Sequence, residues 1–337
     1  MEYRILGRTG VEVSAVTLGC MMFGGENRTS PEDSYAIIDR ALDAGINFLD
    51  TSNSYNAGRS EEVVGEALVR NGRREQVVLA TKVHMRVGPG PNMMGSSRRF
   101  VIAQCEKSLK RLKTDWIDLY QLHRPAPGIP IDETLRALDD LVRSGKIRYF
   151  GTSTFAAWQV LESLWASEKW ALNRVVTEQP PYSIVERRIE RELIPMAQSY
   201  GIAILPWSPL AAGLLTGKYG HGRPVPEDSR YGSMPNRPLD KGRWTQQLYD
   251  VIAKLEPLAA AKGCTLSQLA LAWCVQQPGV TSAIIGPRTM AQYEDNMRAL
   301  AVPITDDDRR AIDRIVPRGG VVVPFYEAGF GPHPHRF

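Results

Sequence analysis

Four side chains that could together deliver a proton lie at or just after the ends of apolar runs. Asp50 and Tyr55 follow one run, Lys82 ends the next, and His123 ends the one after it. A phenol keeps its proton at neutral pH because its ordinary pKa is about 10, and a nearby ammonium makes it a better donor. A carboxylate can hold the ammonium, and an imidazole can orient a substrate oxygen. The set suits protonation of the alkoxide that forms when a carbonyl is reduced.

Each of these residues alone also has an ordinary structural explanation. Asp50 could cap a turn, and Tyr55 could anchor a loop on the surface. Lys82 could be a solvated charge, and His123 could bond to backbone. The catalytic interpretation therefore depends on the fold, which must bring the ends of successive strands together.

Apolar, β-branched runs alternate with helical patterns along nearly the whole chain. Strands are predicted over 14–20, 47–51, 77–83, 117–123, 147–153, 175–179, 202–207 and 280–285. Helices are predicted over 30–44, 60–69, 97–112, 131–144, 156–170, 188–200, 246–261, 266–277 and 289–299. About eight strand–helix units favour an α/β fold, a (β/α)₈ TIM barrel forming a single domain over 1–337. In such barrels the active site lies at the C-terminal ends of the strands, where the four residues are expected to meet.

Three segments fall outside the repeating pattern. Residues 1–12 predict a short hairpin that turns at Arg8-Thr9-Gly10 and plugs the bottom of the barrel. Residues 217–243 are rich in Gly, Pro and charge, and predict a long loop after the seventh strand. The tail from Pro317 onward also contains Gly, Pro and two His.

Composition and motifs exclude several other classes of protein. An open doubly wound sheet that binds a dinucleotide usually carries G-x-G-x-x-G after its first strand, and the segment from Gly19 to Gly25 does not match. There is no Walker A loop and no H-E-x-x-H. The net charge of +4 is too small to indicate binding to nucleic acid or to a membrane surface. Four cysteines without a C-x-x-C pair predict free thiols and no metal site. With no apolar N-terminal stretch, a cytoplasmic location is expected.

Three motifs around the four residues resemble those of a known family. They are Phe48-Leu49-Asp50-Thr51-Ser52-Asn53-Ser54-Tyr55 followed by Gly58-Arg59-Ser60-Glu61, Ala80-Thr81-Lys82-Val83, and Asp118-Leu119-Tyr120-Gln121-Leu122-His123. They are similar to the signature, the lysine strand and the histidine strand of aldo-keto reductases, and the resemblance runs from about Tyr3 to Ala299. It implies a carbonyl reductase with Tyr55 as the acid and Lys82 as its activator. It further implies that Asp50 is the partner of Lys82 and that His123 orients the substrate.

The resemblance also implies NADPH as the cofactor and suggests how its nicotinamide end is held. Gly151-Thr152-Ser153-Thr154-Phe155 is similar to the family's G-x-S-N-F, with Ser153 on the carboxamide and Thr154 in place of the usual Asn. Gln179 matches a carboxamide-binding glutamine, and Glu178 stands where the family often has Asn. Trp207 is the residue expected to stack on the nicotinamide. The pyrophosphate is expected to contact Ser208, Leu210, Gly213, Gly217 and Lys218.

The adenosine end of the cofactor is expected near the start of the last predicted helix. The residues that the resemblance assigns to it are Gly286, Arg288, Gln292, Asp295 and Asn296. Arg288 would pair with the 2′-phosphate, because a guanidinium matches phosphate geometry; the alternative is a solvated charge. Gln292 replaces a second basic residue of many members, and Asp295 a common Glu, which weakens the preference for NADPH over NADH without reversing it. The 217–243 loop is expected to be mobile without cofactor and to order over the pyrophosphate.

Two other functional interpretations stay open. Potassium channel β-subunits share the family's fold and motifs but act as regulatory partners, and the short segment before the first strand argues against that role. A reductase of keto- or enoyl-sugars is a substrate variant of the first interpretation. Arg124 directly follows His123 and favours either an anionic substrate or a salt bridge.

Overall fold

A parallel barrel forms the centre of the computed structural model, which describes residues 1–25, 28–219, 225–227, 229, 232 and 244–325. Its strands are β3 (Val16–Gly19), β4 (Phe48–Asp50), β5 (Val78–Val83), β6 (Ile117–Leu122), β7 (Ile147–Ser153), β8 (Thr177–Gln179), β9 (Ala203–Ile204) and β10 (Ala283–Ile285). They form an eight-stranded sheet in the order β10-β3-β4-β5-β6-β7-β8-β9. A parallel bridge between Ile204 and Val280 joins the two ends of the sheet, and the Ile284 amide donates to the Pro206 carbonyl oxygen at 2.8 Å. The predicted closed (β/α)₈ barrel is therefore confirmed.

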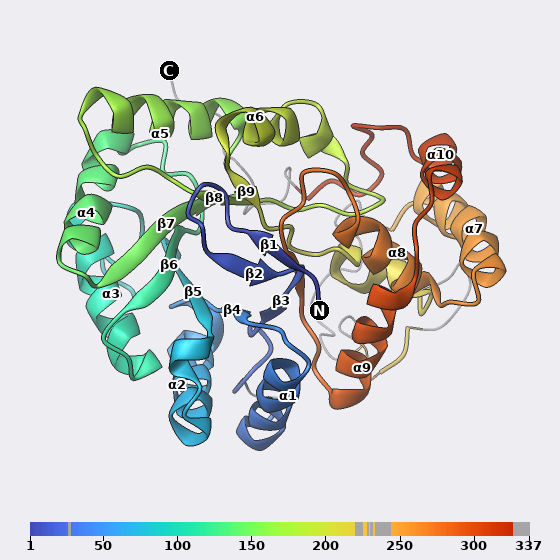
Figure 1. Ribbon diagram of the computed structural model, residues 1–337, viewed down its shortest axis with the longest axis horizontal. Coiled ribbons are helices and arrows are strands. Elements are labelled where there is room, and N and C mark those ends of the chain that lie inside the picture. The colour runs from blue at the N-terminus through green and yellow to red at the C-terminus, as the bar shows by residue number, and fades with distance from the viewer. Residues whose placement is uncertain (26–27, 220–224, 228, 230–231, 233–243, 326–337) are drawn as a thin grey trace.

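Helices surround the sheet on its outer side (Figure 1). They are α1 (Pro31–Asp43), α2 (Arg59–Asn71), α3 (Arg98–Leu112), α4 (Ile131–Arg143), α5 (Ala157–Lys169), α6 (Leu193–Tyr200), α7 (Gln246–Ala261), α8 (Leu266–Val275), α9 (Met290–Arg298) and α10 (Asp306–Ile315). Short 3₁₀ segments are η1 (Tyr55–Gly58), η2 (Arg74–Gln76), η3 (Arg188–Glu190), η4 (Ala211–Thr216) and η5 (Ala299–Ala301). Helix α1 begins as its sequence predicts, because the Ser30 side chain accepts from the Asp33 amide and Pro31 occupies the first turn.

The predicted N-terminal hairpin is present and covers the bottom of the barrel. Strands β1 (Tyr3–Ile5) and β2 (Glu12–Ser14) pair antiparallel and lie across the centre of the view in Figure 1. Leu6 and Val13 are fully buried and pack with interior residues such as Phe48 and Leu119. The hairpin thus fills the end of the barrel opposite the C-terminal ends of the strands.

Some boundaries differ from the predicted ones for identifiable reasons. The seventh predicted strand shrinks to Ala203–Ile204 as a regular element, because Pro180 and Pro206 have no amides for the ladder. The Leu205 and Trp207 amides still donate to the Glu178 and Pro180 carbonyl oxygens, both at 2.9 Å. The helix predicted over 188–200 splits into η3 and α6. Helix α10 was not predicted, although Thr305 caps it and Asp306 to Asp308 complement its N-terminus. Most of the predicted 217–243 loop, and the tail beyond 325, lie outside the described residues.

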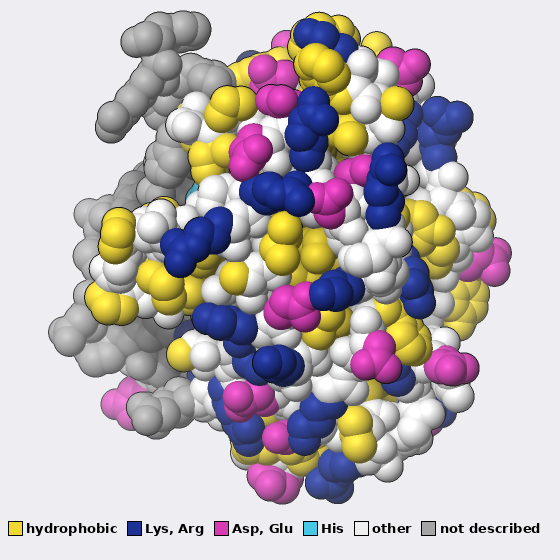
Figure 2. All heavy atoms as spheres, turned by 90° about the vertical axis from the view of Figure 1, so that its left-hand side faces the viewer, with side chains coloured by type: hydrophobic (Ala, Val, Ile, Leu, Met, Phe, Trp, Pro, Cys, Tyr) yellow, Lys and Arg dark blue, Asp and Glu magenta, His cyan; other side chains and the backbone are white. Residues whose placement is uncertain are grey.

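Charges of both signs are mixed on the outer surface. On the face shown in Figure 2, Lys and Arg side chains alternate with Asp and Glu over the outer helices. Within the described ranges no single helix is long and apolar enough to cross a membrane. Only α7 and α8 taken together, with a bend of 88° between them, have the length and apolar composition of a span. The described part of the chain also contains no cluster of three His, Cys, Asp or Glu that could hold a metal ion.

Candidate active site

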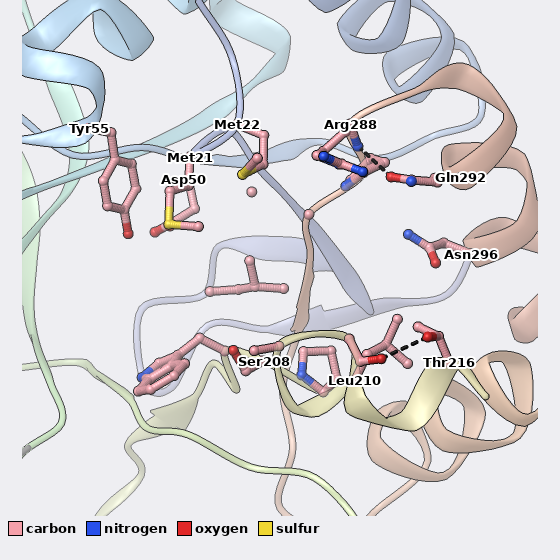
Figure 3. A pocket seen from close by; sticks show the side chains of 18 of the residues that line it. Met21, Met22, Asp50, Tyr55, Ser208, Leu210, Thr216, Arg288, Gln292 and Asn296 are labelled. Atoms are coloured by element: carbon pink, nitrogen blue, oxygen red, sulfur yellow. Dashed lines mark hydrogen bonds between the residues drawn. The ribbon is translucent and has the colours of Figure 1, made fainter. Parts of the chain in front are cut away.

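An elongated cavity of about 770 Å³ opens at the C-terminal ends of the strands (Figure 3). Asp50 and Tyr55 line one end of it, together with His123 from the end of β6. Arg288 and Asn296 line the other end. Its length and the two contrasting ends suit an elongated ligand that reacts at one end and is held by a cation at the other.

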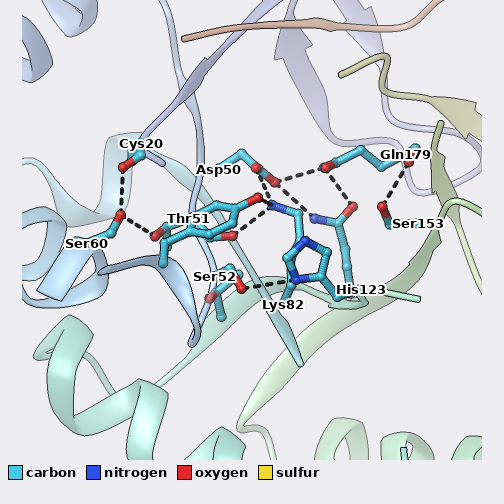
Figure 4. A network of polar contacts seen from close by, with 12 residues as sticks. Cys20, Asp50, Thr51, Ser52, Ser60, Lys82, His123, Ser153 and Gln179 are labelled. Carbon is cyan, nitrogen blue, oxygen red and sulfur yellow. Dashed lines mark hydrogen bonds and ion pairs between the residues drawn. The ribbon is translucent and has the colours of Figure 1, made fainter. Parts of the chain in front are cut away.

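Lys82 is the centre of the polar network at the reacting end (Figure 4). Its ammonium donates to the Asp50 carboxylate, to the Thr51 carbonyl oxygen at 2.8 Å, and to the Tyr55 hydroxyl at 3.4 Å. These three contacts use all three of its donors. Because the phenol oxygen accepts from Lys82, its own proton remains available to a molecule in the cavity.

The electrostatics of this pair favour a charged lysine. Lys82 is fully buried, and burial by itself lowers the pKa of an ammonium. The Asp50 carboxylate beside it more than offsets that effect, so the pKa of Lys82 lies above its ordinary value. The ammonium therefore persists at neutral pH next to the Tyr55 hydroxyl, where it can stabilise a negative charge on the phenol oxygen.

The loop that carries Tyr55 is fixed by backbone and side-chain hydrogen bonds. Asn56 and Ala57 adopt left-handed backbone angles, with φ of 50° and 56°, which turn the chain sharply after Tyr55. The Asn56 side chain donates to the Phe23 carbonyl oxygen at 2.7 Å. Ser60 donates to the Cys20 carbonyl oxygen at 2.7 Å. The loop after β4 is therefore tied to the segment after β3, which holds the phenol in place.

His123 lies edge-on to Tyr55, with ring centroids 5.6 Å apart and planes at 78°. Burial lowers the pKa of His123 well below its ordinary value. The nearby charges of Arg124 and Lys82 lower it further. The imidazole is therefore neutral, and Ser52 Oγ lies 3.2 Å from its Nδ1. A neutral ring that is fixed through Nδ1 can present its other nitrogen to a substrate oxygen.

A layer of amides supports Asp50 from below. The Gln121 and Gln179 side chains donate to the second carboxylate oxygen of Asp50, at 3.1 and 2.9 Å. The sequence had not assigned a role to Gln121. The signal was available, because Gln121 lies two residues before His123 on one strand and therefore shares its face.

Ser153 and Trp207 border the same end of the cavity as Gln179. The Ser153 hydroxyl donates to the Gln179 backbone oxygen at 2.9 Å, so the two residues are held side by side. The Trp207 ring is packed edge-on against Phe325, with centroids 5.5 Å apart. Both predicted nicotinamide contacts and the predicted stacking ring thus line the same cavity as Tyr55.

The segment after Trp207 is a tight turn that lines the middle of the cavity. Ser208, Ala211, Ala212 and Gly213 all have positive φ, between 50° and 99°, and Gly213 is the residue type that adopts this conformation without strain. The Ala211 and Gly213 amides donate to the Ser208 and Leu210 carbonyl oxygens at 2.8 and 2.9 Å, so these angles fold the segment into a tight turn. The cavity is also lined here by Leu210 and Lys218 and by Thr216, which the sequence had not singled out. This stretch fits a pyrophosphate.

The far end of the cavity is built by the start of α9. Arg288 and Gln292 line it, and the Gln292 side chain accepts from the Arg288 amide at 2.8 Å (Figure 3). A Cβ atom at position 286 would have no other atom within 4 Å, so Gly286 leaves open space beside the chain. Asp295 also borders the cavity, but its carboxylate accepts from Ser267 and Gln268 near the start of α8, at 3.2 and 2.6 Å. That carboxylate therefore also fastens α9 to α8, a contact that the sequence had not indicated.

Taken together, the described residues fit a phosphorylated dinucleotide. A tight turn followed by Lys218 lines the middle of the cavity. A guanidinium borders one end, and paired hydroxyl and amide groups border the other. Of the predicted positions, Gly217 does not line the cavity, although its φ of 72° lets the chain turn there.

A closed barrel with a carboxylate, a phenol, a buried ammonium and an imidazole at its C-terminal rim is typical of a barrel oxidoreductase. The comparison with known families agrees, because the model of the aldo/keto reductase family matches residues 15–317. The chain belongs to the aldo/keto reductase family, whose members generally use NAD(P)H.

Curated relatives cover nearly all of the chain. It is 37% identical over 304 residues to "Probable voltage-gated potassium channel subunit beta" of Arabidopsis thaliana, covering 90% of this chain and 92% of the relative. It is 38% identical over 333 residues to "Uncharacterized oxidoreductase YrpG" of Bacillus subtilis (strain 168), covering 96% of this chain and 98% of the relative. A relative named "Putative voltage-gated potassium channel subunit beta" in Schizosaccharomyces pombe is 36% identical over 325 residues, covering 94% of this chain and 93% of the relative.

Proposed function

We propose that the protein reduces an aldehyde, ketone or keto-sugar to the alcohol with NADPH, and that Tyr55 is the proton donor. One observation carries this proposal. The Tyr55 hydroxyl borders the cavity while accepting from the buried ammonium of Lys82 at 3.4 Å, so its own proton faces the space where a carbonyl oxygen would lie. No other described phenol combines those two features.

The protein's contribution to the reaction follows from the contacts of these residues. NADPH, when bound, would supply the hydride. Tyr55 donates its proton to the substrate oxygen, and Lys82 stabilises the negative charge that this leaves on the phenol oxygen. The neutral His123 donates a hydrogen bond to the same substrate oxygen and so orients the carbonyl. Met21, Met22 and Met85 give this end of the cavity an apolar lining, which excludes water.

The preference for NADPH over NADH rests on Arg288 in this proposal. Its guanidinium borders the adenosine end of the cavity, where a 2′-phosphate would be placed by a cofactor lying along the 208–216 segment. A guanidinium pairs with phosphate through two parallel hydrogen bonds, whereas the 2′-hydroxyl of NADH offers no charge to pair.

A direct test measures NADPH oxidation with a panel of aldehydes, ketones and keto-sugars. Lys82→Met serves as the matched negative variant, because methionine fills the volume of the lysine stem without its charge. Turnover of at least one carbonyl by the wild type, and not by Lys82→Met, is expected. The absence of any turnover across the panel, with NADPH bound, would reject the reductase assignment.

The names of the Arabidopsis and fission yeast relatives favour a second candidate function, that of an NADPH-binding regulatory subunit of a potassium channel. The same cavity would then sense the cofactor without needing fast turnover. Co-purification with a potassium channel, together with tight NADPH binding and no carbonyl turnover, would select this candidate.

A further inference from the structure

Arg288, which borders the adenosine end of the cavity, lies in the short link, residues 286–289, between β10 and α9. Thr289 caps α9, since its side chain accepts from the Gln292 amide at 3.2 Å and its carbonyl oxygen accepts from the Tyr293 amide at 3.0 Å. The carbonyl oxygen of Arg288 stands one residue before this cap, outside the hydrogen bonds of the helix. It is therefore left to accept a hydrogen bond from elsewhere in the chain.

The donor is Thr29, a buried residue near the other end of the chain. Its hydroxyl donates to the Arg288 carbonyl oxygen at 2.8 Å, across 259 positions of sequence. Only 3% of Thr29 is exposed. The Arg288 amide is held as well, because it donates to the Gln292 side chain at 2.8 Å. Both polar groups of the Arg288 backbone are thus engaged, one by its own helix and one by a different segment.

Thr29 is itself anchored in the loop after β3. Its amide donates to the Met22 carbonyl oxygen at 3.2 Å, and its carbonyl oxygen accepts from the Gly24 amide at 3.0 Å. Phe23, which pairs with Thr29 through a parallel bridge, is fully buried. The next residue, Ser30, caps α1. The hydroxyl therefore comes from a segment that is fixed on both sides, and it can fix a neighbour in turn.

Other contacts join α1 to α9, which lie side by side (Figure 1). Arg40 pairs with Glu294 at 2.9 Å, and the Tyr293 hydroxyl donates to the Arg40 carbonyl oxygen at 3.3 Å. These contacts lie along the two helices and away from the cavity. The Thr29 contact differs from them, because it reaches the backbone of a residue that borders the cavity.

We propose that Thr29 is a positioning residue for cofactor selection, whose hydroxyl fixes the backbone at Arg288 so that the guanidinium meets the 2′-phosphate of NADPH. The inference rests on the proposed function, in which Arg288 pairs with that phosphate. A guanidinium that binds phosphate through two parallel hydrogen bonds tolerates little displacement, and supporting contacts must hold such a group to within about 0.5 Å. NADH carries a hydroxyl in place of the phosphate, so its binding depends little on where the guanidinium stands. Loss of the Thr29 hydroxyl should therefore weaken NADPH selectively.

The test measures the Kd of NADPH and the Kd of NADH by quenching of tryptophan fluorescence. Thr29→Val keeps the shape of the side chain and removes the hydroxyl. Its Kd for NADPH should rise about 3- to 10-fold, while its Kd for NADH changes less than about twofold. Thr29→Ser keeps the hydroxyl, so both of its Kd values should stay within about twofold of the wild type. If the valine variant did not fold, Thr29→Ala would remove the same hydroxyl without added bulk and carries the same prediction.

Thr134→Val is the matched control. The Thr134 hydroxyl is also buried, and it donates to the Ser96 carbonyl oxygen at 2.8 Å in the first turn of α4. Neither residue is among the described ones that line the cavity. Both valine variants should lower the urea midpoint of unfolding by similar amounts, because each loses one buried hydrogen bond. Only Thr29→Val should change the ratio of the NADH Kd to the NADPH Kd.

A second arm places Thr29→Val in the Arg288→Ala background. With no guanidinium left to position, the added change should alter the Kd of NADPH by less than about twofold. The inference would be overturned, and the proposed function left intact, by an equal effect of Thr29→Val on the two cofactors, by its full effect in the Arg288→Ala background, or by loss of selectivity in Thr29→Ser. A wild type that binds NADPH no better than NADH would instead overturn the cofactor preference in the proposed function.

Discussion

Replacing Asp50 with asparagine removes the carboxylate on which the buried Lys82 depends. Both side chains are almost completely buried, with 5% and 0% of their surfaces exposed. Asp50 also accepts from the Gln121 and Gln179 side chains, at 3.1 and 2.9 Å. An asparagine of the same shape has one acceptor oxygen and cannot satisfy all three donors.

The expected loss of stability follows from the burial of Lys82. Removing one partner of a buried ion pair costs about 3–5 kcal/mol, because the remaining charge is left uncompensated. Burial lowers the pKa of Lys82 once the opposing carboxylate is gone, so the lysine sheds part of this cost by losing its proton. We therefore expect the free energy of unfolding at pH 7 to fall by about 3 kcal/mol. A neutral lysine no longer supports the phenol, so kcat should fall by about 10²-fold or more.

Urea unfolding followed by tryptophan fluorescence measures the first effect, and NADPH oxidation measures the second. Glu294→Gln is the matched control, since Glu294 pairs with Arg40 at 2.9 Å with both side chains substantially exposed. An exposed pair contributes at most about 1 kcal/mol, and it lies far from the reaction. If Asp50→Asn lost no more stability than this control and kept its turnover, the described role of the carboxylate would be wrong.

Three further variants test other parts of the site. Arg288→Ala should weaken the binding of NADPH by about 10- to 100-fold while leaving the binding of NADH nearly unchanged. If the ratio of the NADH Kd to the NADPH Kd were the same before and after the change, the assignment of Arg288 to the 2′-phosphate would be contradicted. Gly213→Ala, at a φ of 99°, should raise the Kd of NADPH and cost about 1 kcal/mol in unfolding free energy, checked by fluorescence titration and urea unfolding. Ser52→Ala should lower kcat severalfold at unchanged NADPH affinity, since it frees His123 Nδ1; unaltered kcat would show that the imidazole needs no such support.

The sequence carried much of the fold because several strands end in or are followed by polar residues and several helices begin with a capping side chain. Ser30 and Pro31 mark the start of α1, and the Gly at 201 ends α6 in the left-handed conformation. The strand pattern predicted the number and direction of the strands. The brief regular length of β9 was not predicted, although Pro180 and Pro206 are visible in the sequence and lack the amides that a ladder needs.

The site was predictable where alternation along a strand fixes which side chains face inward. Asp50, Lys82 and His123 share the barrel interior for that reason, and the structure brings them next to Tyr55. Their catalytic roles, the cofactor contacts and the single-domain organisation stay predictions. The support from Gln121 was missed although its spacing from His123 predicted an inward side chain, because its contact with Asp50 joins strands distant in sequence.

The central claim is that the Tyr55 hydroxyl protonates the substrate at a site loaded with NADPH. The most direct measurement compares wild type and Tyr55→Phe in two assays, carbonyl-dependent NADPH oxidation and NADPH binding by fluorescence. We predict that the variant loses about 10²–10⁴ in kcat, as expected for a general acid, while its Kd for NADPH stays within about twofold of the wild type. Turnover by Tyr55→Phe at the wild-type rate, with the cofactor equally bound, would contradict the account.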